Sequence, residues 1–124
     1  MNQSDALRAK RKELVVAAEK VIDAAFSSGR RLDLKKSQLN HLVGICGEAT
    51  CAEEIENYIR YQAGRDKTGW DLSLAHQVID GARGVIQPLS DAEKLNAWSL
   101  YAVYLTRAFT YRSKASEAAS GRRR

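Results

Sequence analysis

Apolar residues recur every three to four positions in five separate segments that together span most of the chain. This spacing gives each segment one apolar face when it coils as an α-helix, whereas no stretch shows the alternation of a half-buried strand. A single Pro among 124 residues also argues against a β-protein rich in turns. The sequence therefore predicts an all-α fold. The segments expected to be helical are 5–28, 35–47, 50–64, 71–87 and 91–114.

Several helix ends are marked by residues that suit them. Ser90 with Glu93, and Thr50 with Glu53, each fit a capping box, in which two side chains satisfy unpaired N–H groups at a helix start. Pro88 closes the fourth helical segment, because the residue before a proline avoids helical geometry. The short connections favour antiparallel neighbours. We therefore expect a compact bundle of about five helices.

The length of 124 residues is that of one domain. Hydrophobic residues make up 44% and charged residues 28%, a balance typical of a globular protein rather than a disordered one. Residues 1–115 are predicted to form a single helical domain. Residues 116–124 consist of Ser, Glu, Ala, Gly and Arg and are predicted to be a disordered basic tail.

Two features of the sequence bear on localisation. No apolar run approaches the ~20 residues that cross a bilayer, and no apolar stretch near the start resembles a secretory signal. Two cysteines are too few for a disulfide scaffold, which makes a reducing compartment the natural setting. We expect a cytoplasmic protein with no membrane partner.

Residues suited to catalysis or metal binding are scarce. His41, His76, Cys46 and Cys51 are the only histidines and cysteines, and they lack the close ligand pair of a zinc site. A zinc site or a Cys–His nucleophile pair stays open at this point, although the apolar neighbours of Cys46 suggest burial. We expect no catalytic residue, no metal site and no cofactor.

An acidic cluster opens the third helical segment. Glu53, Glu54 and Glu56 are placed where negative charge stabilises the positive end of the helix dipole. The turn near Gly47 would also suit a helix-turn-helix. However, acidic residues there would repel phosphates where a recognition helix contacts DNA. We therefore interpret the cluster as structural.

Basic residues are the clearest functional signal. The chain holds 20 Lys and Arg against 15 Asp and Glu, a net charge of +5, and cations of this kind attract polyanions. From the placement of charge alone, the residues expected to bind an RNA backbone are Lys35, Lys36, Lys67, Arg107, Arg112 and Lys114.

Tyrosines lie among the cations of the last helical segment. Tyr104, Arg107 and Tyr111 are spaced to share one helix face, which is offset from the main apolar stripe. Such a second face is typical of a binding surface or of an interface with a partner helix. The alternative is a solvated basic face with half-buried tyrosines. We assign Tyr101, Tyr104 and Tyr111 to a partner interface.

Three motifs together resemble a known family. They are Ser37-Gln38-Leu39, the run Tyr-Ile-Arg-Tyr-Gln-Ala-Gly-Arg at 58–65, and a final helix rich in aromatic residues and alanine. Their order and approximate spacing over 34–114 are similar to those of the small subunit of type III-A CRISPR effector complexes (the Csm type). The small subunit of type III-B complexes is the nearest relative. Asn40 departs from the pattern, because the family often has a basic residue there.

The resemblance implies a short, all-helical, non-catalytic subunit. Several copies of such a subunit stack beside larger backbone subunits and line the channel in which guide RNA pairs with target RNA. Its partners would be guide RNA, target RNA and other effector subunits, including further copies of itself. By the family motif, Arg60 and Arg65 would hold the RNA backbone without reading sequence. The alternative is a helical protein–protein adaptor or regulator with no nucleic-acid role.

Overall fold

The computed structural model describes residues 4–29 and 31–122. These residues form helices and loops only, which confirms the all-α prediction. Each helix begins within two residues of its expected start, and the first four also end within one residue of their expected ends. The helices are α1 (Asp5–Ser27), α2 (Lys36–Glu48), α3 (Ala52–Gly64), α4 (Leu72–Ile86) and α5 (Asp91–Arg122).

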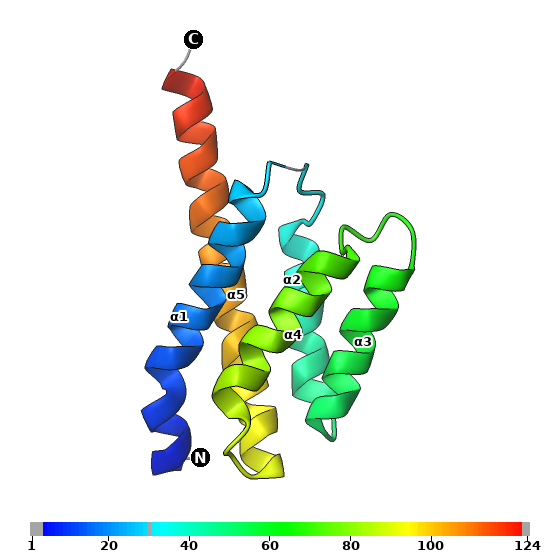
Figure 1. Cartoon of the computed structure of the whole chain (residues 1–124), viewed down its shortest axis with the longest axis vertical. Helices are drawn as coiled ribbons and strands as arrows, with labels where there is room; N and C mark the ends of the chain where they lie inside the picture. The colour runs from blue at the N-terminus through cyan, green and yellow to red at the C-terminus, as the bar shows by residue number, and fades with distance from the viewer. Residues whose placement is uncertain (1–3, 30, 123–124) are drawn as a thin grey trace.

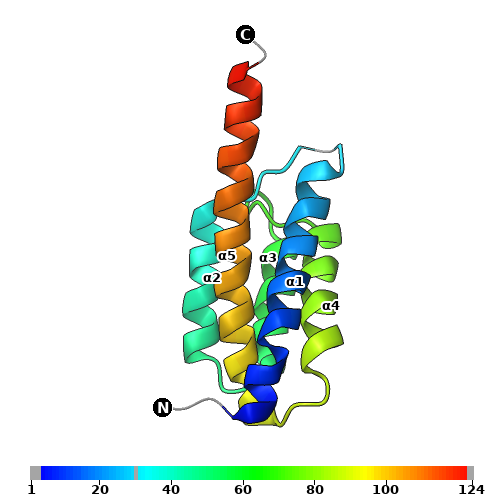
Figure 2. The ribbon, with the colours of Figure 1, turned by 90° about the vertical axis from the view of Figure 1, so that its left-hand side faces the viewer.

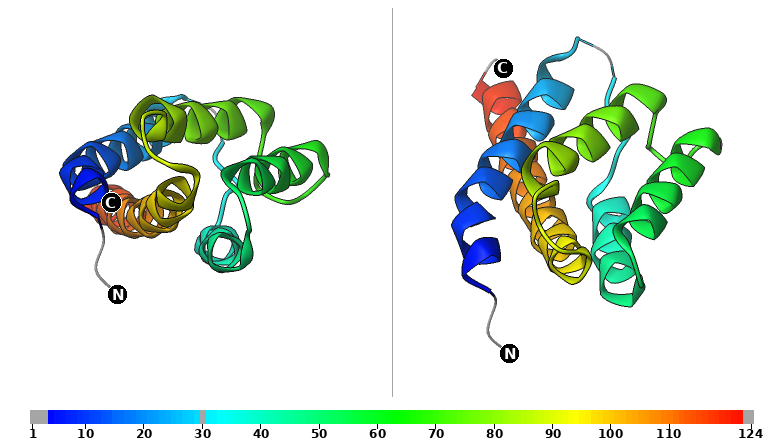
Figure 3. Two further views of the ribbon diagram at one scale, coloured as in Figure 1. Left: turned by 90° about the horizontal axis from the view of Figure 1, so that it is seen from below. Right: turned by 60° about the horizontal axis from the view of Figure 1, so that its bottom comes forward.

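Helices that follow one another in sequence run in opposite directions, and α5 returns alongside α1 in the same direction (Figures 1 and 2). Viewed from below, α5 lies between α1 and α2, with α4 and α3 on its other side (Figure 3). Helix α5 contacts all four other helices, and its longest contact is with α1. The last helix is therefore the centre of the packing.

The core combines the apolar stripes of the five helices. In α4 the buried residues include every position that the spacing placed inside, namely Leu74, Ala75, Val78, Ile79, Ala82 and Ile86. In α5 the buried surface is wider than one stripe, because neighbours lie on several sides of this helix. The buried residues of α5 are Ala97, Trp98, Tyr101, Ala102, Tyr104, Leu105 and Phe109.

Tyr101 shows how tightly the centre is packed. Its side chain is 0% exposed, and its ring meets that of Trp98 edge to face with centroids 5.4 Å apart. The Tyr101 hydroxyl donates a hydrogen bond of 2.9 Å to the Val78 carbonyl, and burial raises the pKa of this hydroxyl above its ordinary value. The hydroxyl lies so near Gly81 that a Cβ atom there would be 2.6 Å away.

Of the two capping boxes, one is confirmed and one is wrong. The Glu93 amide donates to Ser90 Oγ and the Ser90 amide donates to Glu93 Oε1, each at 3.3 Å. The box at Thr50 and Glu53 does not form, because α3 begins two residues later than expected, with Cys51 as its N-cap residue. The carboxylate that receives the Thr50 amide is that of Glu54, at 2.8 Å.

The end of α5 differs from the prediction. The helix continues to Arg122, so 116–122 is helical rather than a disordered tail; residues 123–124 lie outside the described part. Ala115, Ala118 and Ala119 favour helix, and extending a formed helix adds one hydrogen bond per residue without a new nucleation step. Because α1 ends at Ser27, the last turns of α5 project beyond the bundle (Figure 2).

A helix that spans a membrane must be both long and apolar. None of the described helices combines enough length with enough apolar character to cross a bilayer.

Candidate nucleic-acid interface

Cations from three segments of the chain gather at one end of the bundle, where α1 and α3 end and α2 and α4 begin (Figure 1). They are Arg31, Lys35, Lys36, Arg65 and Lys67, and all five side chains are exposed. Four were predicted to bind RNA, and Arg31 joins them. We term these five residues the basic end.

Acidic residues open two helices at the opposite end of the bundle. Glu53 and Glu54 lie in the first turn of α3 and Asp91 and Glu93 in that of α5, which confirms the structural interpretation of the first two. Glu48 at the end of α2 adds a further carboxylate. This end also carries Arg8, Lys10, Arg11 and Lys12 of α1, so its charge is mixed.

A hollow of about 400 Å³ lies within the basic end. It is bounded by the linker between α1 and α2 and by the loop between α3 and α4. Among the described residues, the Lys35 and Lys67 ammonium groups have no ion-pair partner, whereas Arg31 Nε lies 2.9 Å from Asp33 Oδ1. The residues that line the hollow are Arg31, Asp33, Lys35, Gln38, Lys67, Gly69, Trp70 and Asp71.

The loop that carries Lys67 is held rigidly. Thr68 Oγ1 donates to the Gln62 carbonyl at 2.6 Å and accepts from the Trp70 amide at 3.3 Å. Gly69 has a φ of 84°, and a Cβ atom there would lie 2.9 Å from the Asp33 carbonyl oxygen, so only glycine allows the two loops to meet. Trp70 is 5% exposed and anchors the loop in the core.

Arg65 ends α3 beside an exposed aromatic ring. Its guanidinium carbon lies 5.2 Å from the centroid of Tyr61, whose side chain is 60% exposed. The pKa of nearby Tyr58 is raised above its ordinary value, because partial burial outweighs the opposing effect of the positive charge of Arg65. An exposed Arg–Tyr pair can contact a phosphate and stack on a base. The predicted site omitted Tyr61, although its spacing of four residues from Arg65 on one helix indicates the contact.

Arg60 lies apart from the basic end, on the surface between α3 and α4. Its Nη2 is 3.5 Å from Oε1 of Glu56, and Arg83 of α4 binds the same carboxylate at 2.6 and 2.9 Å. The hydrogen bond to Glu56 raises the pKa of Arg83. The interpretation of Glu56 as a dipole-stabilising residue is wrong, because its buried carboxylate joins two helices.

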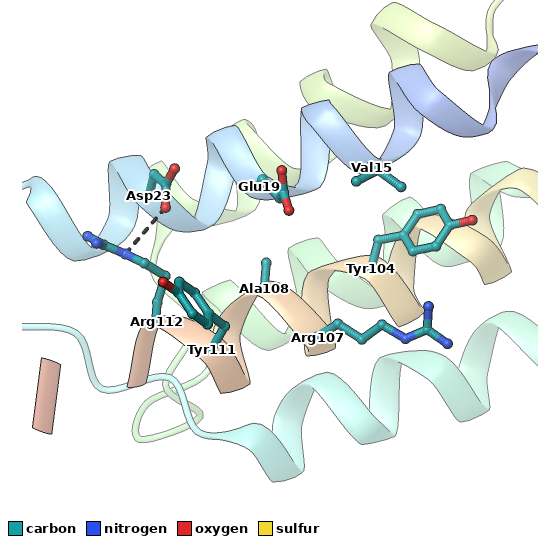
Figure 4. A pocket seen from close by; sticks show the side chains of 8 residues that line it. All are labelled: Val15, Glu19, Asp23, Tyr104, Arg107, Ala108, Tyr111 and Arg112. Carbon is teal, nitrogen blue, oxygen red and sulfur yellow. Dashed lines mark ion pairs between the residues drawn. The ribbon is translucent and has the colours of Figure 1, made fainter. Parts of the chain in front are cut away.

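The predicted cations of α5 lie along a groove beside α1 (Figure 4). Arg112 is engaged within the chain: its Nε is 3.3 Å from Asp23 Oδ1, and its guanidinium covers the Phe26 ring at 5.3 Å. Arg107 is exposed and lies 5.9 Å from the centroid of the Tyr104 ring. Lys114 is exposed beyond the groove. These cations are therefore spread along α5 rather than gathered in the hollow.

The three tyrosines predicted to form a partner interface differ in how deeply they are buried. Tyr101 belongs to the core, so its assignment to a partner interface is wrong. Tyr104 is 8% exposed, and its hydroxyl accepts a hydrogen bond of 3.3 Å from Arg11 Nε of α1. Tyr111 is 72% exposed. Helical spacing correctly places Tyr104 and Tyr111 on one face, but α1 covers only the first of them.

The cysteine environments bear on the alternatives left open by the sequence. Cys46 is buried, and burial raises the pKa of its thiol to about 12, so it stays protonated at neutral pH and is a poor nucleophile. Within 4–29 and 31–122, no three His, Cys, Asp or Glu side chains are grouped so that they could hold a metal ion.

Comparisons of the chain with models of protein families, with curated proteins and with solved structures find no match.

Proposed function

We propose that this chain is a non-catalytic RNA-binding subunit of a cytoplasmic type III CRISPR effector, and that the basic end holds the RNA backbone. The observation that carries the proposal is the convergence of Lys35, Lys36, Arg65 and Lys67, which come from distant segments, at one end of the bundle. Surface cations that share no function would be scattered over the bundle rather than gathered at one end. The resemblance of the motifs to the small subunit supports the same function.

In this proposal the cations neutralise phosphates and release counterions, so they fix the position of the RNA without reading its sequence. Tyr61, exposed beside Arg65, stacks on an unpaired base. Guide and target RNA occupy the basic end. Other effector subunits, including further copies of this chain, contact the remaining surface.

Salt-dependent binding of a fluorescent single-stranded RNA tests the role of the basic end. We expect the triple variant K35E/R65E/K67E to bind at least tenfold more weakly, and the slope of log K against log salt to fall by about 2, since each lost contact removes about 0.7. The matched control R8E/K12E/K20E makes the same charge change at exposed positions of α1. Equal losses in the two triple variants would refute a localised site.

A specific observation favours a helical adaptor as a second candidate. Helix α5 projects beyond the bundle, and the groove of about 410 Å³ beside it ends at the exposed ring of Tyr111. Purification of the tagged chain from its native cells separates the two candidates. Short guide RNAs in the eluate support the effector subunit. A defined protein partner without RNA, lost in Tyr111→Ala and kept in the basic-end variant, supports the adaptor.

A further inference from the structure

The start of α2 has residues that disfavour a helix start. Lys35 is the N-cap residue and Lys36 the first residue of the helix, so two positive charges lie at the positive end of the dipole. An ammonium group has no acceptor and cannot cap the helix, whereas Asp71 accepts the Leu74 amide at the start of α4. Gln38 Oε1 receives the Lys35 amide at 2.7 Å, but no acceptor among the described residues receives the Lys36 amide.

Lys67, which also lines the hollow, has a backbone conformation that is unfavourable for a lysine. Its φ is 64°, the left-handed region that glycine adopts freely and that costs other residues about 1 kcal/mol or more. It is the only non-glycine residue with positive φ in the described part of the chain. The strain places a lysine, rather than a glycine, beside the hollow that also contains Lys35.

Cations outnumber carboxylates in the lining of the hollow, three against two. The carboxylate of Asp33 is paired with Arg31, and that of Asp71 caps α4. The lining therefore keeps one net positive charge and two ammonium groups without an ion-pair partner among the described residues, which an anion would offset.

We propose that this hollow binds one terminal phosphoryl group, held by the Lys35 and Lys67 ammonium groups. A phosphomonoester carries nearly two negative charges at neutral pH, against one for an internal phosphodiester. It also has only one ester substituent to accommodate, which suits a hollow bounded by two rigid loops. The group belongs to an RNA end or to a free phosphate compound; only the first source rests on the proposed function.

Nuclear magnetic resonance of the ¹⁵N-labelled full chain tests the site, with inorganic phosphate as the probe and sodium chloride at equal ionic strength as the reference. We expect saturable shifts of the Lys35, Lys67 and Gly69 amides, which belong to residues that line the hollow. The Trp98 amide is an internal control, because Trp98 is 0% exposed and lies in the core. Shifts that chloride reproduces, or the absence of saturation, would overturn the proposal.

Variants separate binding from folding. Lys67→Gly removes the ammonium and keeps the φ angle, so it should weaken phosphate binding about tenfold while the melting temperature stays equal or rises. Lys35→Ala should weaken binding similarly. Lys12→Ala removes an exposed cation outside the hollow and should leave binding unchanged. Unaltered phosphate affinity in Lys67→Gly would contradict the site.

A third arm identifies the source of the phosphate, with RNAs of one sequence that carry a 5′-phosphate, a 3′-phosphate or hydroxyls only. A tenfold preference for either phosphorylated RNA assigns the hollow to an RNA end. Equal affinities, with inorganic phosphate still bound, assign it to a free phosphate compound. If phosphate binds and no RNA does, the proposed function fails and this site stands. If RNA binds without any phosphate response, the site fails alone.

Discussion

Two tyrosines of α5, ten residues apart, show how differently the two halves of one helix behave. Tyr101 is 0% exposed and donates a hydrogen bond to α4, whereas Tyr111 is 72% exposed beside a groove. The first half of α5 is surrounded by the other four helices, and the second half passes the end of α1 and has no such cover. Helical spacing shows which residues share a face, but the lengths of the neighbouring helices decide whether that face is covered.

The sharpest test of this contrast removes each ring. Tyr101→Ala should lower the free energy of unfolding by about 3–5 kcal/mol, because it leaves a cavity and an unpaired Val78 carbonyl in the core. Tyr111→Ala should change it by less than about 0.5 kcal/mol. Urea denaturation followed by circular dichroism measures both values. Similar losses in the two variants would show that both halves of α5 are packed alike.

Two glycines of α4 provide a finer test of the packing around Tyr101. A Cβ at Gly81 would lie 2.6 Å from the Tyr101 hydroxyl, whereas one at Gly84 would meet nothing within 4 Å. Gly81→Ala should therefore destabilise the fold by about 1–3 kcal/mol. Gly84→Ala should stabilise it by up to about 1 kcal/mol, because alanine favours helix more than glycine does. Thermal melts compare the two, and a neutral Gly81→Ala would mean that the hydroxyl can move aside.

The smallest effect on stability is expected from the projecting turns. Ending the chain after Lys114 removes a segment none of whose described side chains belongs to the core, so the free energy of unfolding should change by less than about 0.5 kcal/mol. The helical signal should still fall, since 115–122 is helical in the full chain. A large loss of stability would contradict the division of α5 into a packed half and an exposed half.

The sequence was sufficient to predict the positions of the helices, because the apolar stripe and the end signals of a helix are local properties. It also identified most cations of the basic end, but not their convergence. Lys35 and Lys67 are 32 positions apart, and they line one hollow only because Gly69 lets two loops meet. The burial of Tyr101 and Trp70 likewise depends on neighbours from other helices, which no local pattern specifies.

The central position of α5 has a consequence for the order in which the molecule is built. Synthesis proceeds from the N-terminus, so α1 to α4 leave the ribosome before the helix that all four contact has been made. Until then their apolar faces have no common surface on which to close. The bundle therefore completes its core after most of its sequence has been translated, and a nascent chain that stops before α5 would expose the same leucines and isoleucines that the finished protein buries.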